Sequence, residues 1–371
     1  MHRTKILEEA DRLMTVCNSC RYCEGLCAVF PAMEMRRAFS DGDLNYLANL
    51  CHACGACYTD CQFSPPHEFN VNVPRTLAVA RAESYAAYAW PRAFAGTFAR
   101  NGLVISLVAA LSVAAFIFGF AAMNDRQILF GTHTGPGAFY KLMPHNAMAA
   151  LFGAAFLYAI AALAMGVRAF WRDIGEPIGM KTDARALLQA IRDAGDLRYL
   201  DGGGVGCFNE DDRPTDRRKL YHHFTFYGFA LCFASTCVAT LYHYLLAREA
   251  PYPWWDLPVV LGTLGGIGLL IGPIGLLAER WKRDSILVDE ARYGMDVAFI
   301  VMLFLTSLTG MVLLILRETA AMGPLLALHL GVVFSLFVTM PYGKFVHGIY
   351  RFAALVRYAM ERRAMAQGAA E

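Results

Sequence analysis

Charged side chains are scarce in this sequence. Asp, Glu, Lys and Arg make up 17% of the 371 residues, whereas 57% are hydrophobic, and soluble domains contain about 25% charged residues. The formal net charge is only +2, which is too small to indicate a nucleic-acid-binding surface. The composition therefore argues against an ordinary soluble domain and predicts a membrane protein that binds no nucleic acid.

Two other signals are absent. Residues 1–14 mix acidic and basic side chains without an apolar h-region, so we expect no cleaved secretion signal. The run Asp201-Gly-Gly-Gly-Val205 lacks the spacing and the strand–helix context of a dinucleotide fingerprint. We interpret this run as a turn-forming loop, and we hypothesise that it belongs to a surface on which a partner protein docks.

Long uncharged segments dominate the chain after residue 100. Six stretches contain no Asp, Glu, Lys or Arg: 101–124, 142–167, 220–247, 257–278, 297–316 and 319–343. Each can cross a hydrocarbon core of about 30 Å at about 1.5 Å per residue. The alternative, buried helices of a large soluble protein, would require all six to reach spanning length by chance.

The first 95 residues are different, being polar and rich in cysteine and proline. We therefore predict an N-terminal domain at 1–95 and a membrane domain at 96–371, with a cytoplasmic insertion at 168–219. The insertion should contain a short amphipathic helix around Lys181–Ala194, and the N-terminal domain should contain helices at Glu8–Val16, Phe39–Leu50 and Pro74–Ala89. The predicted fold class is all-α, with a six-helix transmembrane bundle.

Eight of the eleven cysteines form two runs with identical spacing. The runs are Cys17, Cys20, Cys23 and Cys27, and Cys51, Cys54, Cys57 and Cys61. In two-cluster ferredoxins, three closely spaced thiolates bind one [4Fe–4S] cluster and the fourth binds the other. We therefore predict one cluster on Cys17, Cys20, Cys23 and Cys61, and a second on Cys51, Cys54, Cys57 and Cys27. Structural zinc is the alternative, although zinc sites usually use two ligand pairs separated by a loop.

Histidine is costly inside an apolar helix unless its ring is paired or bound to a metal. His329 and His347 are 18 residues apart on one predicted helix, so both rings should leave the same face about 27 Å apart. His222 and His243 lie at opposite ends of the third stretch. Matching by depth, we predict axial ligands of b-type haem in two pairs: His243 with His329, and His222 with His347.

Alternatives stay open at the histidines. His223 could take the place of His222, although it lies about 160° away from His243 around a helix. His145, His222 and His223 could instead cap helices or bind lipid headgroups. The number of haems, one or two, is also open.

The basic residues are distributed unequally between the two ends of the predicted spans. The segments 168–219, 280–296 and 344–371 hold 19 Lys and Arg, whereas the opposite loops 125–141, 248–256 and 317–318 hold four. Because basic loops stay on the cytoplasmic side, we predict that both termini and the cysteines are cytoplasmic in a bacterial inner membrane.

Several segments support a family resemblance. They are Leu50-Cys-His-Ala-Cys-Gly-Ala-Cys57, Pro65-Pro-His-Glu-Phe69, Asp196-Leu-Arg-Tyr-Leu-Asp-Gly-Gly-Gly204, His223-Phe-Thr-Phe-Tyr-Gly228 and Met340-Pro-Tyr-Gly-Lys-Phe-Val-His-Gly348. With them, essentially the whole chain resembles the tricarballylate-utilisation (citrate-utilisation) protein B family and the C-terminal half of the cobalamin-biosynthesis protein CobZ. The N-terminal domain resembles the α-helical ferredoxins of fumarate reductase and heterodisulfide reductase subunits. The last five spans resemble the nitrate reductase γ-subunit type of cytochrome b.

The family resemblance implies a partner and a direction of electron flow. It implies that the chain re-oxidises the reduced FAD of a cytoplasmic tricarballylate dehydrogenase, through two [4Fe–4S] clusters and b-type haem, and reduces a membrane quinone. We expect no substrate chemistry in the chain itself. A quinone could lie near Tyr342, Lys344 and His347, or near His133 and His145. The alternative is a membrane subunit of a heterodisulfide-reductase-like catalytic complex, for which Cys207 is the one candidate further cysteine.

Overall fold

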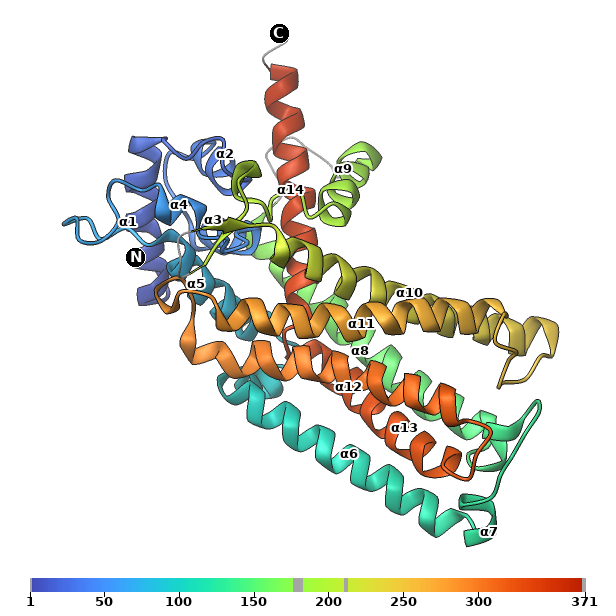
Figure 1. The fold of residues 1–371 in the computed structure, drawn as a ribbon. Helices are drawn as coiled ribbons and strands as arrows, with labels where there is room; N and C mark the ends of the chain where they lie inside the picture. Colours follow the sequence, from blue (N-terminus) through green and yellow to red (C-terminus); the bar gives the residue numbers. More distant parts are fainter. Residues whose placement is uncertain (1, 176–182, 210–212, 369–371) are drawn as a thin grey trace.

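The structure is a computed structural model that describes residues 2–175, 183–209 and 213–368 (Figure 1). Almost all of these residues are helical or lie in turns. The one sheet within the described ranges is a short antiparallel ribbon of β1 (Cys207–Phe208) and β2 (Pro214–Thr215), in which Cys207 pairs with Thr215. The all-α prediction is therefore confirmed.

The N-terminal unit is built from five helices. They are α1 (Lys5–Cys20), α2 (Val29–Glu34), α3 (Asp41–Leu50), α4 (Ala56–Thr59) and α5 (Val73–Tyr88). Side-chain caps set their starts: Thr4 accepts a hydrogen bond from Leu7 N, and Ser40 and Asp43 form a capping box at α3. The three helices predicted here correspond to α1, α3 and α5, and α1 is longer at both ends than its periodic pattern.

Long apolar helices run side by side away from the N-terminal unit and form a bundle (Figure 1). They are α6 (Asn101–Met123), α8 (His145–Ile174), α10 (Arg217–Leu246), α11 (Leu257–Trp281), α12 (Tyr293–Leu316) and α13 (Met322–Thr339). Within the described ranges, six helices are long and apolar enough to cross a membrane, and they coincide with the six predicted stretches. Their length and composition indicate a membrane protein.

Glycine allows α10 and α11 to approach closely. A Cβ on Gly228 would lie 2.9 Å from the carbonyl oxygen of Gly265, and a Cβ on Gly265 would lie 2.7 Å from the backbone nitrogen of Cys232. Small residues at such crossings are typical of helix pairs in membranes, where backbone packing replaces the hydrophobic effect as the source of association.

Shorter elements close the two ends of the bundle. At the end distant from the N-terminal unit are α7 (Arg126–Leu129) and η2 (Ala138–Lys141). At the other end are η1 (Arg92–Arg100), α9 (Ala184–Gly195), η3 (Gly202–Gly204), η4 (Ser285–Leu287) and η5 (Glu290–Arg292). Asp183 caps α9, which is the amphipathic helix expected around 181–194; residues 181 and 182 lie outside the described ranges.

The prediction that His329 and His347 share one helix is wrong. Helix α13 ends at Thr339, a short turn η6 (Met340–Tyr342) follows, and α14 (Val346–Gly368) begins in another direction (Figure 1). Pro341 lacks the N–H that a continuing helix needs and restricts the residue before it, and Gly343 is extended at φ −135°. The two rings therefore do not share one helical face.

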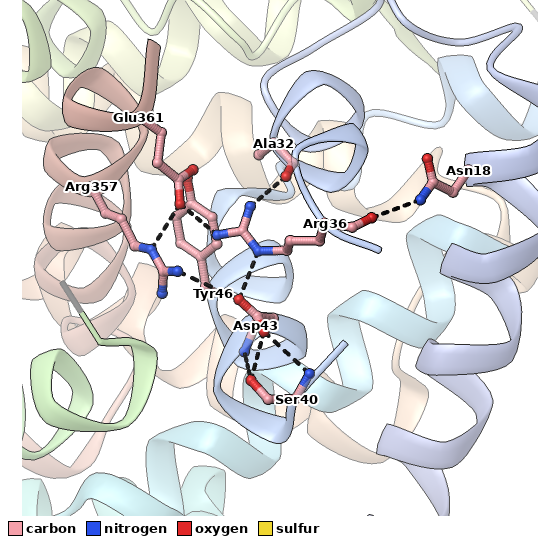
Figure 2. Close-up of polar contacts among 8 residues, drawn as sticks. All are labelled: Asn18, Ala32, Arg36, Ser40, Asp43, Tyr46, Arg357 and Glu361. Atoms are coloured by element: carbon pink, nitrogen blue, oxygen red, sulfur yellow. Dashed lines mark hydrogen bonds and ion pairs between the residues drawn. The ribbon is translucent and has the colours of Figure 1, made fainter. Parts of the chain in front are cut away.

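Helix α14 is attached to the N-terminal unit by a buried set of charges, which we call the α14 anchor (Figure 2). Arg36 contacts Asp43 at 2.6 Å and Glu361 at 2.5 Å. Arg357 also binds Glu361 at 3.0 Å, and the Tyr46 hydroxyl donates to Glu361 at 2.8 Å. The side chains of Arg36 and Glu361 are each 8% exposed. Buried charges are tolerated only when they are paired in this way, so the anchor orients α14 on α3.

Candidate metal centres

Five cysteines line one cavity of about 230 Å³. Four of them form the first cysteine site: Cys17, Cys20, Cys23 and Cys61. The last turn of α1 supplies Cys17 and Cys20, and the turns after α1 and α4 supply the other two. Apolar side chains such as Phe30 and Phe63 complete the wall, and Tyr22 at the rim is 72% exposed. The first site thus lies close to the surface of the N-terminal unit.

The other four cysteines form the second cysteine site: Cys27, Cys51, Cys54 and Cys57. They line a smaller cavity together with His52 and Pro74. Cys57 also borders the cavity of the first site, so the two sites are neighbours. Cys51 and Cys54 are buried, and the N–H of Phe208 donates to the carbonyl oxygen of Cys54 at 2.9 Å. The second site therefore lies beneath the insertion, nearer to the bundle.

The donor chemistry of both sites fits iron–sulfur clusters. Burial raises the pKa of Cys17 to about 12, and the neighbouring Cys23, Cys61 and Cys20 add to this effect. Burial likewise raises the pKa of Cys54 to about 11. A raised pKa means that the buried thiolate form is unfavourable by itself. These cysteines can be deprotonated only when a cationic centre compensates the charge of the thiolates. Within the described residues, no three His, Cys, Asp or Glu side chains converge closely enough for a single metal ion, whereas a cubane is bound at its separate corners.

The segment Asp201–Val205, which we call the glycine loop, covers the second site. A Cβ on Gly202 would lie 2.9 Å from the Ala56 Cβ and 3.9 Å from the Cys54 Sγ, and a Cβ on Gly203 would lie 3.2 Å from the Leu26 Cα. Both glycines have positive φ, at 56° and 79°, a region that residues with a Cβ rarely adopt. The loop hypothesised as a docking surface therefore has a structural role on its inner side.

Cys207 lies in a small apolar core beside this loop. It is 2% exposed and packs with Leu200, Phe208 and Cys54. The thiol considered for a heterodisulfide-type reaction is thus shielded from solvent. Cys232 is half-buried and Cys237 exposed, and both lie on α10.

His222 and His347 come together at the end of the bundle nearest the second site. Their ring centres are 6.2 Å apart, at an interplanar angle of 75°. The Nδ1–H of His347 donates to the carbonyl oxygen of Lys344 at 2.5 Å, which leaves Nε2 free as a ligand, as metal-bound histidines require. The Nδ1 of His222 is buried without a partner. Two imidazoles on opposite sides of one metal ion stand about 6 Å apart when each metal–nitrogen bond is about 2 Å, so this pair fits one haem iron.

The predicted pair of His243 and His329 has a different arrangement. His243 stacks on His145 with ring centres 3.5 Å apart, which leaves no room for an iron between the two rings. His329 instead shares a hydrogen bond of 3.0 Å with the Thr309 hydroxyl and lies against Gly310. The Nδ1 atoms of His145 and His243 are buried without partners. A haem on His243 and His329 remains a prediction, and the structure adds His145 as a neighbour of His243.

The remaining histidines differ in their surroundings. His133 bonds to the carbonyl oxygen of Ile128 at 2.7 Å, and His223 lies against Tyr227. His52 was not predicted as a site residue, because it stands inside the cysteine motif. It is buried beside the second site, and burial, together with the charges of Arg351, Arg218 and His222, lowers its pKa well below the usual value. His52 therefore lies at the second cysteine site and near His222.

The fold and the two cysteine sites define an iron–sulfur type of electron-transfer protein joined to a membrane-type helical bundle. Residues 10–87 match the family model of the citrate utilization protein B Fer4-like domain, and residues 96–369 match that of citrate utilization protein B. A protein of Escherichia coli named "Citrate utilization protein B" is 51% identical over 356 residues, which cover 96% of this chain and 92% of that protein. The chain therefore belongs to the citrate utilization protein B family, and the resemblance seen in the sequence is confirmed. No solved structure matches the chain.

Proposed function

We propose that this protein carries electrons from the reduced FAD of a cytoplasmic partner dehydrogenase to a membrane quinone. The observation that supports this most strongly is a continuous series of sites. Cys57 of the second site also borders the cavity of the first, and His52 lines the cavity of the second. His52 is near enough to His222 for the two rings to interact electrostatically, and His222 faces His347. The name of the Escherichia coli relative refers to citrate utilisation, and we propose a tricarballylate-dehydrogenase-like flavoprotein as the partner.

Each site has a distinct role in this proposal. When bound, two [4Fe–4S] clusters and b-type haem would accept and release one electron at a time, which divides the two-electron chemistry of a flavin. The cysteines hold the clusters, and Phe30 and Phe63 reduce access of water to the first site. The hydrogen bond to Lys344 O keeps the proton of His347 on Nδ1.

The exposed first site is the place where electrons would enter. Tyr22 lies at its rim, whereas the second site is covered by the glycine loop. Both the N-terminal unit and α14 lie at one end of the bundle (Figure 1), and the sequence segments at this end hold most of the basic residues. We propose that this end is cytoplasmic, in the inner membrane of a bacterium.

Anaerobic optical and EPR spectroscopy of the detergent-purified protein, with iron and pyridine-haemochrome assays, tests the proposal. We expect about eight non-haem iron atoms per chain, a reduced b-type α-band, and two interacting cluster signals after dithionite. Cys20→Ser should remove or alter one cluster signal. Cys237→Ser, which changes an exposed cysteine of α10, should leave both signals unchanged. A preparation that binds zinc in place of iron, or that has clusters but no haem, would contradict the respective part of the proposal.

A further inference from the structure

Three arginines from three different elements converge on the backbone of residues 49–53, at the start of the second cysteine motif. Arg81 of α5 donates to the carbonyl oxygen of Cys51. Arg351 of α14 donates to the same oxygen at 2.8 Å and to that of Asn49 at 3.2 Å. Arg218 of α10 donates to the carbonyl oxygens of His52 and Ala53 at 3.1 and 3.2 Å. The N-terminal unit, the bundle and α14 thus all place a positive charge at this site.

The protein supplies little counter-charge for these arginines. The carboxylate of Asp296 lies near enough to Arg81 to interact with it, but its ion pairs are with Lys344 at 2.7 Å and Arg280 at 3.7 Å. Within the described ranges, none of the three arginines forms an ion pair with a carboxylate. Arg81 is 8% exposed, and burial and the neighbouring Arg81 lower the pKa of Arg351 to about 9. Carbonyl oxygens accept their hydrogen bonds but do not neutralise their charge. Since an excess of buried positive charge is costly, it indicates a further anionic group at this place.

A fourth arginine supports the presence of an anionic group at the second site. Arg283, between α11 and η4, has two nitrogen atoms, Nε and Nη2, that are buried without a hydrogen-bond partner. Arg218, Cys207 and Cys54 are near enough to interact electrostatically with this guanidinium, so it lies near the second site. A cluster bound by four thiolates is anionic, and its sulfur atoms could accept the two unpaired N–H groups.

The first cysteine site has different electrostatic surroundings. The carboxylate of Asp60 lines its cavity. Arg21, which follows Cys20, is exposed and donates to the carbonyl oxygen of Asn18 at 3.2 Å. An exposed charge is screened by water and salt much more than a buried one. Asp60 is exposed as well, so both charges at the first site are screened. The arginines at the second site are buried or half-buried, so the two sites differ in how much unscreened positive charge lies beside them.

We propose that Arg81, Arg218, Arg283 and Arg351 raise the reduction potential of the cluster at the second site above that of the first, and so direct electrons toward the bundle. A reduced cluster carries one more negative charge than an oxidised one, so nearby positive charges stabilise the reduced state. In the step itself, one electron leaves the cluster at the first site and reduces the cluster at the second, and no bond or proton changes place. The inference rests on the two clusters of the proposed function.

An EPR-monitored redox titration of the full-length purified protein tests this order. In the wild type we expect the second-site signal, identified by its change in Cys54→Ser, to appear at a higher potential than the first. Arg218→Gln should move the second-site midpoint to lower potential and leave the first-site midpoint in place. Arg218→Lys keeps the positive charge, so its second-site midpoint potential should stay close to that of the wild type. Arg248→Gln is the matched control, because Arg248 pairs with Asp256 at the distant end of the bundle.

Each outcome is decisive. A higher potential at the first site in the wild type overturns the inference, and so does an Arg218→Gln variant that shifts both midpoints equally or neither. If Arg218→Gln fails to assemble the second cluster, Arg283→Gln provides the same comparison without loss of a backbone hydrogen bond. A wild-type protein without two clusters would instead refute the proposed function itself, which separates the two failures.

Discussion

One hydrogen bond fixes the tautomer of the His347 imidazole and leaves its other nitrogen available to bind a metal. Its Nδ1–H is held by the carbonyl oxygen of Lys344, one turn earlier in the chain, and burial together with Arg351 and Lys344 lowers its pKa well below the usual value. A neutral imidazole with a fixed tautomer is the form that ligates a metal. His222 faces it with an unpaired buried Nδ1.

We predict that His347→Ala removes the haem that we propose for this pair. The pyridine-haemochrome assay should show loss of at least half of the haem, because a single remaining axial ligand does not hold the group as tightly. His223→Ala is the matched control, since the adjacent His223 contacts Tyr227 instead. Full haem content in His347→Ala would assign the ligand elsewhere.

At the level of elements, the glycine loop and the α14 anchor hold the sites in place. The loop uses positive-φ glycines because its backbone touches the protein surface around Cys54. The anchor uses buried ion pairs because α14 must be oriented, as well as packed, on α3. Neither element contains a predicted metal ligand, apart from His347 at the start of α14.

The loop gives a prediction that separates a steric clash from backbone strain. Gly202→Ala should place a Cβ against Ala56, lift the loop and make the second cluster more sensitive to air. Gly204→Ala introduces similar strain, at φ +99°, but meets no atom within 4 Å. The rate at which the second-site EPR signal disappears in air should therefore increase more in Gly202→Ala. Equal rates in the two variants would show that the loop does not protect the site.

The anchor gives a prediction about stability. Glu361→Ala leaves Arg36 and Arg357 buried without their shared partner, which we expect to cost about 3 kcal/mol. Glu9→Ala breaks an exposed pair with Arg12 and should cost about 1 kcal/mol or less. Thermal unfolding in detergent should show the larger decrease in melting temperature for Glu361→Ala, with loss of haem at a lower temperature because α14 carries His347. Similar decreases for both variants would argue against the anchor.

For the whole molecule, the proposed orientation can be tested by labelling introduced cysteines. Arg126 of α7 and Arg192 of α9 are both exposed and lie at opposite ends of the bundle. In intact spheroplasts, a membrane-impermeant maleimide should label Arg126→Cys and should label Arg192→Cys only after lysis. The native chain, without either added cysteine, provides the background. The reverse pattern would place the clusters outside the cytoplasm.

Local patterns were sufficient for much of this fold. The six uncharged stretches predicted α6, α8, α10, α11, α12 and α13, because spanning a membrane imposes length and composition on each helix separately. The eight cysteines could be identified for a similar reason: cluster ligands from one run lie within a few residues of one another. Pro341 in the sequence indicates the break between α13 and α14, but the prediction of one helix gave more weight to the hydrophobic run before it.

Contacts between distant residues could not be inferred in this way. The amino-acid order predicted which cysteines and histidines were candidates, but the stacking of His243 on His145 and the position of His52 depend on how helices pack. The arginines around the second site come from residues 81, 218, 283 and 351, and no local spacing relates them. The spacing of the cysteine ligands is a property of residues close together in the sequence. The electric field at a cluster is the sum of contributions from side chains that are far apart in the sequence, and only the tertiary structure brings these together.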